Sequence, residues 1–171
     1  PVGPGDTLAA GARLLVAGEP KQVDELRAAT AATVREFTTQ RVLLAGYGDS
    51  GEAAAAALRE AGGEVTVLDS TPGEAVDTVG DAREPEVLEA AGIETADALV
   101  VTVSDDTTAI LATLIARELN PELEILVRAN ERAGVDKLYR AGADYVQSLA
   151  AISGRMLADT VFEDEEVLAY S

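Results

Sequence analysis

Three glycines stand between an apolar run and an alanine-rich run in the stretch RVLLAGYGDSGEAAAAAL, residues 41–58. Gly46, Gly48 and Gly51 have the spacing G-x-G-x-x-G, which is common in ordinary turns when it stands alone. The apolar residues before the glycines predict a buried strand. The alanines after them predict a helix that ends at the pair Gly62-Gly63. The chain must therefore make a tight turn from a strand into a helix at this point.

Strand-like and helix-like segments alternate along the rest of the chain. We expect strands over residues 41–45, 64–69, 76–79, 96–104, 124–129 and 143–146. Between and after them we expect helices over residues 50–61, 84–91, 105–119, 131–141 and about 150–161. Alternation at this spacing is typical of an α/β fold with a doubly wound, Rossmann-like parallel sheet of six strands.

The two ends of the chain are predicted to lie outside this sheet. Residues 1–38 contain a strand at 13–17 and a helix at 20–31, which are too few elements for a core of their own. We interpret them as the tail of a preceding lobe or as a linker arm, residues 39–148 as a nucleotide-binding domain, and residues 149–171 as a crossover helix and tail. The last helix is a candidate homodimer interface, with core packing as the alternative for its apolar residues Ile152, Met156, Leu157 and Val161.

Composition excludes several kinds of chemistry. The 171 residues include no cysteine and no histidine, so disulfides, thiolates and the usual general base are absent.

The formal charge of −18 comes from 31 acidic and 13 basic residues, so nucleic acids and anionic lipids are not expected partners. No apolar run approaches the roughly 18–20 residues of a membrane span, and we recognise no signal peptide. We expect a cytoplasmic, globular protein adapted to high salt.

The glycine motif has the surroundings of a phosphate-binding loop. Gly46 would allow the tight turn, Gly48 the close approach of a pyrophosphate, and Gly51 the packing of helix on strand. The free N–H groups and the dipole of the following helix would then meet the phosphates. The loop residues of this candidate site are Gly46, Tyr47, Gly48, Asp49, Ser50 and Gly51.

Residues at the ends of other strands complete the candidate site. Asp69, 18 positions after Gly51 and followed by Ser70, would bind the ribose hydroxyls and repel a 2′-phosphate, which favours NAD over NADP. The alternative for Asp69 is a solvated aspartate at a strand end. Asp81 and Ala82 would flank the adenine, and the last part of the site is Thr102 and Ser104. Ser104 and Asp105 have an alternative role as a helix N-cap pair.

These segments resemble a known family. The segments that carry the resemblance are VLLAGYGDSG, VTVLD, VGDAREPEVLEAAGIETADALVVTVS and the stretch from RANERAGVDKLYRAGADYV to ISGRMLA. Over about residues 40–161 the chain is similar to the RCK/KTN domain, also called the TrkA N-terminal domain. The resemblance implies a cytoplasmic domain at the inner face of the membrane that regulates a potassium channel or transporter. It implies binding of an adenine nucleotide, NAD(H) first and AMP, ADP or ATP otherwise. It also implies assembly with itself into dimers or rings.

The chain departs from the family pattern at three points. Only STPGEAVD, residues 70–77, lies between Asp69 and Thr78, so we expect the usual helix between the second and third strands to be missing or reduced. Asp49 stands where ATP-binding relatives often have a basic residue, which disfavours ATP. Arg128 and Asn130 stand where some calcium-gated relatives have carboxylates, so we expect no such metal site. Arg128 would reach a phosphate, a neighbouring subunit or one of the many carboxylates.

Two other functions remain open on the sequence alone. An NAD-dependent oxidoreductase shares the fold, but the chain has no histidine and no second domain for a substrate. It also has no tyrosine followed four residues later by lysine, because Tyr139 leads to Ala143 and Tyr145 leads to Leu149. The other alternative is a structural element of a gating ring that has lost its ligand. We expect a regulatory domain and not an enzyme, with no catalytic residues.

Overall fold

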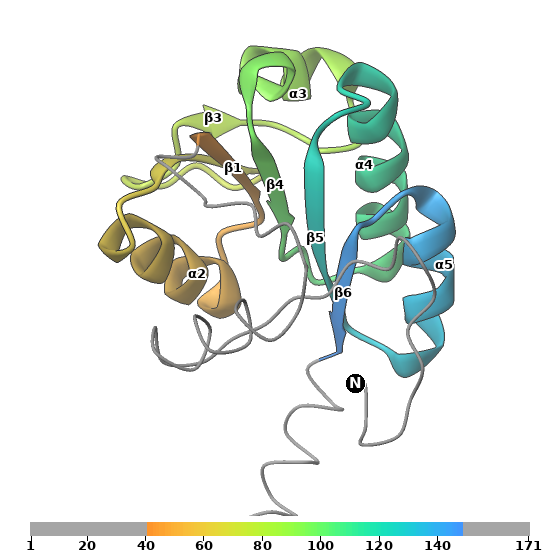
Figure 1. Cartoon of the computed structure of the whole chain (residues 1–171). Helices are drawn as coiled ribbons and strands as arrows, with labels where there is room; N and C mark the ends of the chain where they lie inside the picture. Colours follow the sequence, from red (N-terminus) through yellow and green to blue (C-terminus); the bar gives the residue numbers. More distant parts are fainter. Residues whose placement is uncertain (1–40, 149–171) are drawn as a thin grey trace, which may run out of the picture. The chain divides into compact units, whose positions relative to one another are not determined.

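The computed structural model describes residues 41–148 (Figure 1). The expected strand at residues 13–17 and the expected helices at 20–31 and about 150–161 lie outside the described residues. The two outer segments of the predicted domain organisation lie there as well, and so do the four apolar residues of the proposed dimer interface.

The six expected strands form one parallel sheet. Their order is β3-β2-β1-β4-β5-β6, and every neighbouring pair is parallel, so the predicted Rossmann-like topology is confirmed. The strands are β1 Arg41–Ala45, β2 Glu64–Asp69, β3 Thr78–Val79, β4 Ala98–Val101, β5 Glu124–Ala129 and β6 Tyr145–Ser148. Since β1 pairs with β2 on one side and β4 on the other, the direction of winding reverses beside the end of β1. In this class of fold, ligands bind outside the carboxyl ends of the strands at that reversal.

Helices cover both faces of the sheet, as Figure 1 shows. On one face the main core joins strand residues such as Leu43, Leu99 and Ile125 to Leu88 and Leu138 of the helices. The helices that contribute to this core are α3 Pro85–Ala90, α4 Asp106–Leu119 and α5 Val135–Ala141. On the other face, α2 Asp49–Glu60 contributes Ala55 to a smaller cluster with Leu44 and Val67.

Four elements differ from the expected boundaries by two residues or more. The fourth strand, expected over residues 96–104, covers only Ala98–Val101. The third strand keeps only two residues, because Asp77 accepts a hydrogen bond from the Val67 N–H at 2.8 Å through its side chain. The sixth strand begins two residues later than expected, where Tyr145 pairs with Leu126. The helix expected over 131–141 is divided into a 3-10 turn, Arg132–Gly134, and α5. A second 3-10 turn, Ile93–Thr95, precedes β4.

The connection between β2 and β3 contains no helix within residues 70–77. This confirms the expectation drawn from its short length. The end of β2 is therefore bordered by turns, and Gly80 N donates to the Asp69 carbonyl oxygen at 2.9 Å where β3 ends.

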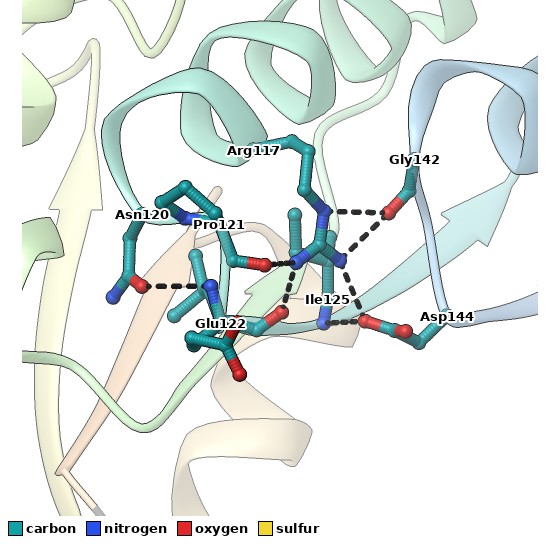
Figure 2. Close-up of polar contacts among 8 residues, drawn as sticks. Arg117, Asn120, Pro121, Glu122, Ile125, Gly142 and Asp144 are labelled. Atoms are coloured by element: carbon teal, nitrogen blue, oxygen red, sulfur yellow. Dashed lines mark hydrogen bonds and ion pairs between the residues drawn. The ribbon is translucent and has the colours of Figure 1, made fainter.

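A single arginine ties β5 and β6 to the end of α4 (Figure 2). Arg117 uses all five of its N–H groups. It donates them in bonds of 2.6–3.2 Å to the carbonyl oxygens of Pro121, Leu123 and Gly142 and to the Asp144 carboxylate. The same Asp144 oxygen accepts the Ile125 N–H at 2.9 Å. This cluster fixes the start of both strands at the end of the sheet away from the glycine turn.

None of the helices within residues 41–148 has the length and apolar character that a membrane span would need.

Candidate functional site

The turn after β1 has a backbone that only glycine adopts easily. Gly46 has a φ of +100°, and its N–H donates to the Leu68 carbonyl oxygen at 2.8 Å. Thr102, directly after β4, closes the turn from the other side, since its hydroxyl donates to the Gly46 carbonyl oxygen at 2.7 Å. The turn is thus bonded to both neighbouring strands.

The other two glycines of the motif have different surroundings. A Cβ on Gly51 would lie 2.1 Å from the Gly46 carbonyl oxygen, so the first turn of α2 packs directly against the preceding backbone. A Cβ on Gly48 would meet nothing within 4 Å, and its φ of −82° suits any residue. Packing therefore requires a glycine at position 51, whereas at position 48 the protein leaves open space.

The N-terminus of α2 presents free N–H groups beside Gly48. The first helical bond runs from the Glu52 N–H to the Gly48 carbonyl oxygen at 2.9 Å, and no side chain caps the helix. The N–H groups of Asp49, Ser50 and Gly51 have no helical acceptor, and the positive end of the helix dipole lies with them. The Asp49 side chain is exposed. This arrangement suits an anion.

Arg128 of β5 lies against this helix end. Its Nη1 donates to the Ser50 hydroxyl oxygen at 2.7 Å, and its Nη2 donates to the Val103 carbonyl oxygen at 3.2 Å and to the Asn130 side chain at 2.7 Å. Its Nε is buried without a partner. Within residues 41–148, no carboxylate pairs with Arg128. A guanidinium with no ion-pair partner among residues 41–148 thus lies beside a helix N-terminus whose first turn carries the acidic residues Asp49 and Glu52.

Asn130 and Asp106 extend this cluster, although sequence reasoning gave neither a role in the site. The Asp106 carboxylate accepts from the Asn130 backbone N–H at 2.8 Å and from the Asn130 side-chain amide at 2.9 Å. A Cβ on Gly134 would lie 2.3 Å from Asp106, so the turn before α5 also packs on it. These contacts hold Arg128 in place from the side away from Ser50. No local sequence signal marks them, because the residues are up to 28 positions apart.

Asp69 binds the glycine turn directly. Its Oδ2 accepts the Tyr47 N–H at 2.6 Å and its Oδ1 accepts the Thr71 N–H at 2.7 Å. A carboxylate has about four lone-pair sites, so each oxygen keeps one for a sugar hydroxyl. Ser70, next to Asp69, is exposed. The aspartate is therefore more than a solvated strand end, because it fixes the spacing between β2 and the loop.

The structure places the two predicted adenine-side residues in different environments. Ala82 is buried in the main core. Asp81 is held by Arg83, whose Nε lies 3.0 Å from both carboxylate oxygens. The hydrogen bonds from the Arg83 side chain, followed by the one from its backbone N–H, lower the pKa of Asp81.

The residues after β4 divide between two roles. Asp105 caps α4, since its carboxylate accepts the Thr108 N–H at 2.7 Å and the Thr108 hydroxyl at 2.8 Å. The backbone bond from Thr108 is the main cause that lowers the pKa of Asp105. The cap alternative is therefore confirmed for Asp105. Ser104 is exposed, and Thr102 belongs to the glycine turn as described above.

The sequence profile described as the TrkA-N domain matches residues 42–149, which is more than half of the chain. The chain belongs to the TrkA-N family. One relative of similar sequence is the probable potassium channel protein 2 of Methanocaldococcus jannaschii, which is 42% identical over 81 residues, 47% of this chain and 24% of that protein. The chain thus spans only about a quarter of this curated relative, or less of other relatives.

Two solved structures extend the likeness of this TrkA-N domain. The GsuK channel bound to NAD has a TM-score of 0.70 and 32% identity, over 77% of this chain and 25% of that one. The Kef C-terminal domain of Shewanella denitrificans in its AMP-bound form has a TM-score of 0.67 and 28% identity, over 77% of this chain and 82% of that one. Adenine nucleotides are bound in both of these structures.

Metal binding has no support in the described part of this TrkA-N domain. Residues 41–148 place no group of three or more aspartate or glutamate side chains where they could hold a metal ion together. Arg128 and Asn130 at the end of β5 bind each other and their neighbours, as described above.

Proposed function

We propose that this TrkA-N domain binds an adenine nucleotide at the β1–α2 turn and thereby regulates a potassium channel or transporter. The observation that carries the proposal is the Arg128 guanidinium beside the uncapped start of α2, with a buried, unpartnered Nε and no ion-pair partner within residues 41–148. A phosphate there would accept from the free N–H groups of the helix and from the guanidinium. The open space at Gly48 leaves room for it.

Within this proposal NAD(H) is the preferred ligand, and AMP, ADP and ATP are the alternatives. The single pyrophosphate bridge of NAD matches a site that offers one helix N-terminus and one arginine. A triphosphate would place more negative charge near the exposed Asp49 carboxylate. The NAD-bound and AMP-bound relatives support an adenine nucleotide of low charge.

The proposed setting is the cytoplasmic face of the membrane. The domain would act within a dimer or ring of identical copies, attached to or associated with the membrane part of a potassium channel or transporter. The match to a potassium channel protein supports this partner. A ligand acts on such an assembly by its different affinity for two arrangements, so nucleotide binding would shift the equilibrium between them.

Replacement of Gly48 by valine tests the site with little effect on the fold. The new side chain enters open space with an allowed φ, so the melting temperature should stay within a few degrees of the wild type. It fills the place of the phosphate, so the affinity for NAD or AMP should fall at least about tenfold, or 1.4 kcal/mol. Calorimetric titration of the full chain measures the affinity. Unchanged affinity in the folded variant, or no binding by the wild type at millimolar nucleotide, would rule out the proposed site.

Asp69→Asn tests the ribose end of the same ligand. The neutral side chain no longer repels a 2′-phosphate, so the ratio of the affinity for NAD to the affinity for NADP should fall about tenfold. The amide carries one acceptor oxygen where the carboxylate has two, so one of the bonds to Tyr47 and Thr71 is also lost. Paired titrations with NAD and NADP give the ratio. Glu64→Gln, at the opposite end of β2, is the matched control and should leave the ratio unchanged.

A further inference from the structure

Arg83 has an unusually fixed position for an exposed arginine. It lies in the loop between β3 and α3, where Asp81 accepts from its Nε, its Nη2 and its backbone N–H. The side chain of Arg83 is nevertheless 49% exposed. Its Nη1 has no hydrogen-bond partner among residues 41–148. Two-point binding of a guanidinium by a carboxylate sets the orientation of its plane.

The loop that carries Arg83 begins beside the proposed ribose-binding residue. Gly80 N donates to the Asp69 carbonyl oxygen at 2.9 Å, so Asp81 and Arg83 follow the end of β3 at a point where it is bonded to the end of β2. The pKa of Arg83 is raised, first by the hydrogen bonds to Asp81 and also by the charge of Asp105 at the start of α4. The loop that carries the guanidinium lies at the carboxyl edge of the sheet, beside the end of β2.

Beside Asp69, Tyr47 is half-buried and packs against the cluster of Leu44, Ala55 and Val67. The connection over residues 70–77 has no helix, and Ala82 is buried in the core. A base attached to a ribose at Asp69 would extend over the loops that follow β2 and β3. Arg83, in the loop after β3, is a planar group whose orientation is set by Asp81.

We propose that the Arg83 guanidinium, held in one plane by Asp81, stacks on the adenine base of the bound nucleotide. This inference rests on the proposed function and adds to it the residue that selects for a base. Arginine suits the task because its flat, weakly hydrated cation packs on aromatic faces, whereas the ammonium group of lysine is a compact, strongly hydrated charge. Asp81 acts as a positioning residue for Arg83.

The test compares a ligand that has the base with one that lacks it. AMP and ribose 5-phosphate are titrated against the full chain, by calorimetry and by NMR respectively. In Arg83→Ala we expect the affinity for AMP to fall about three- to thirtyfold, since stacking of this kind contributes about 0.5–2 kcal/mol. The affinity for ribose 5-phosphate should stay within about twofold. Arg83→Lys should lose most of the AMP affinity that Arg83→Ala loses.

Two further variants complete the design. Arg59→Ala removes the same charge at the other end of α2, where the arginine is exposed, and should leave both affinities unchanged. Asp81→Asn keeps the guanidinium but weakens its hold, and should give an intermediate loss for AMP. Melting curves confirm that each variant is folded.

Several results would overturn the inference. Equal weakening of AMP and ribose 5-phosphate would mean that Arg83 acts on the phosphate as a charge. Full AMP affinity in Arg83→Lys or in Arg83→Ala would exclude stacking while leaving the proposed function intact. Failure of the folded wild type to bind AMP or NAD would overturn the proposed function, and this inference with it.

Discussion

Replacing Gly51 with alanine is expected to lower the free energy of unfolding by about 3 kcal/mol or more. The added methyl group would lie 2.1 Å from the Gly46 carbonyl oxygen and 2.9 Å from its carbon. Both are backbone atoms, and the hydrogen bonds from Thr102 and to Leu68 hold this turn on two sides, so the neighbours cannot move away cheaply. Urea unfolding monitored by circular dichroism measures the loss.

The matched control lies three residues earlier in the same loop. Gly48→Ala adds the same methyl group where nothing lies within 4 Å, and should change the unfolding free energy by less than about 1 kcal/mol. If the two variants had equal stability, the close packing of α2 on the glycine turn would be wrong, and with it the geometry of the site.

Replacing Arg117 with methionine is expected to cost about 3 kcal/mol of unfolding free energy. Methionine has similar length and helix propensity, so the change removes the donors more than the packing. The carbonyl oxygens of Pro121, Leu123 and Gly142 and the Asp144 carboxylate would lose the bonds that Figure 2 shows. The ion pair is mostly shielded from water, with the two side chains 27% and 18% exposed. Denaturant unfolding measures the change.

An exposed ion pair elsewhere in the sheet provides the comparison. Arg41 Nε lies 3.5 Å from Asp97 Oδ2, and the two side chains are 55% and 43% exposed. Because water screens such a pair, Arg41→Met should lower the free energy of unfolding by less than about 1 kcal/mol. A loss for Arg117→Met no larger than that for Arg41→Met would show that the Arg117 cluster does not stabilise the β5–β6 edge. Neither residue belongs to the proposed nucleotide site, so nucleotide affinity in both folded variants should be unchanged.

The order of strands and helices could be predicted because it depends on local patterns. Apolar runs of strand length, an alanine-rich helix after three glycines, and Pro85 in the first turn of α3 are all visible along the chain. Boundaries were less predictable where a side chain replaces a backbone bond. Asp77 takes the Val67 N–H and shortens β3, and Asp144 takes the Ile125 N–H just before β6 begins.

Some residues of the candidate site could likewise be predicted from local patterns, and others could not. The glycine turn and the acidic residue after the second strand follow from a known spacing, so Gly46, Gly51 and Asp69 could be singled out in advance. The hydrogen-bond partners of Arg128 and Arg83 could not be predicted from the sequence. Arg128 has one neighbour 78 positions away and another two positions away, and only the fold brings Ser50 and Asn130 to the same guanidinium. The proposed role of Arg83 depends on the loop after β3, which is bonded to the end of β2 at Gly80.

The most direct test of the central claim is to follow the backbone amides of the full chain by NMR while AMP or NAD is added. The N–H groups at the start of α2 should move first and saturably, because they would donate to the phosphate. We predict the largest shifts at Gly48, Asp49, Ser50 and Gly51, with a response of the Arg128 side-chain N–H signals at the same nucleotide concentration. Saturable binding that left these signals in place and moved others would contradict the account.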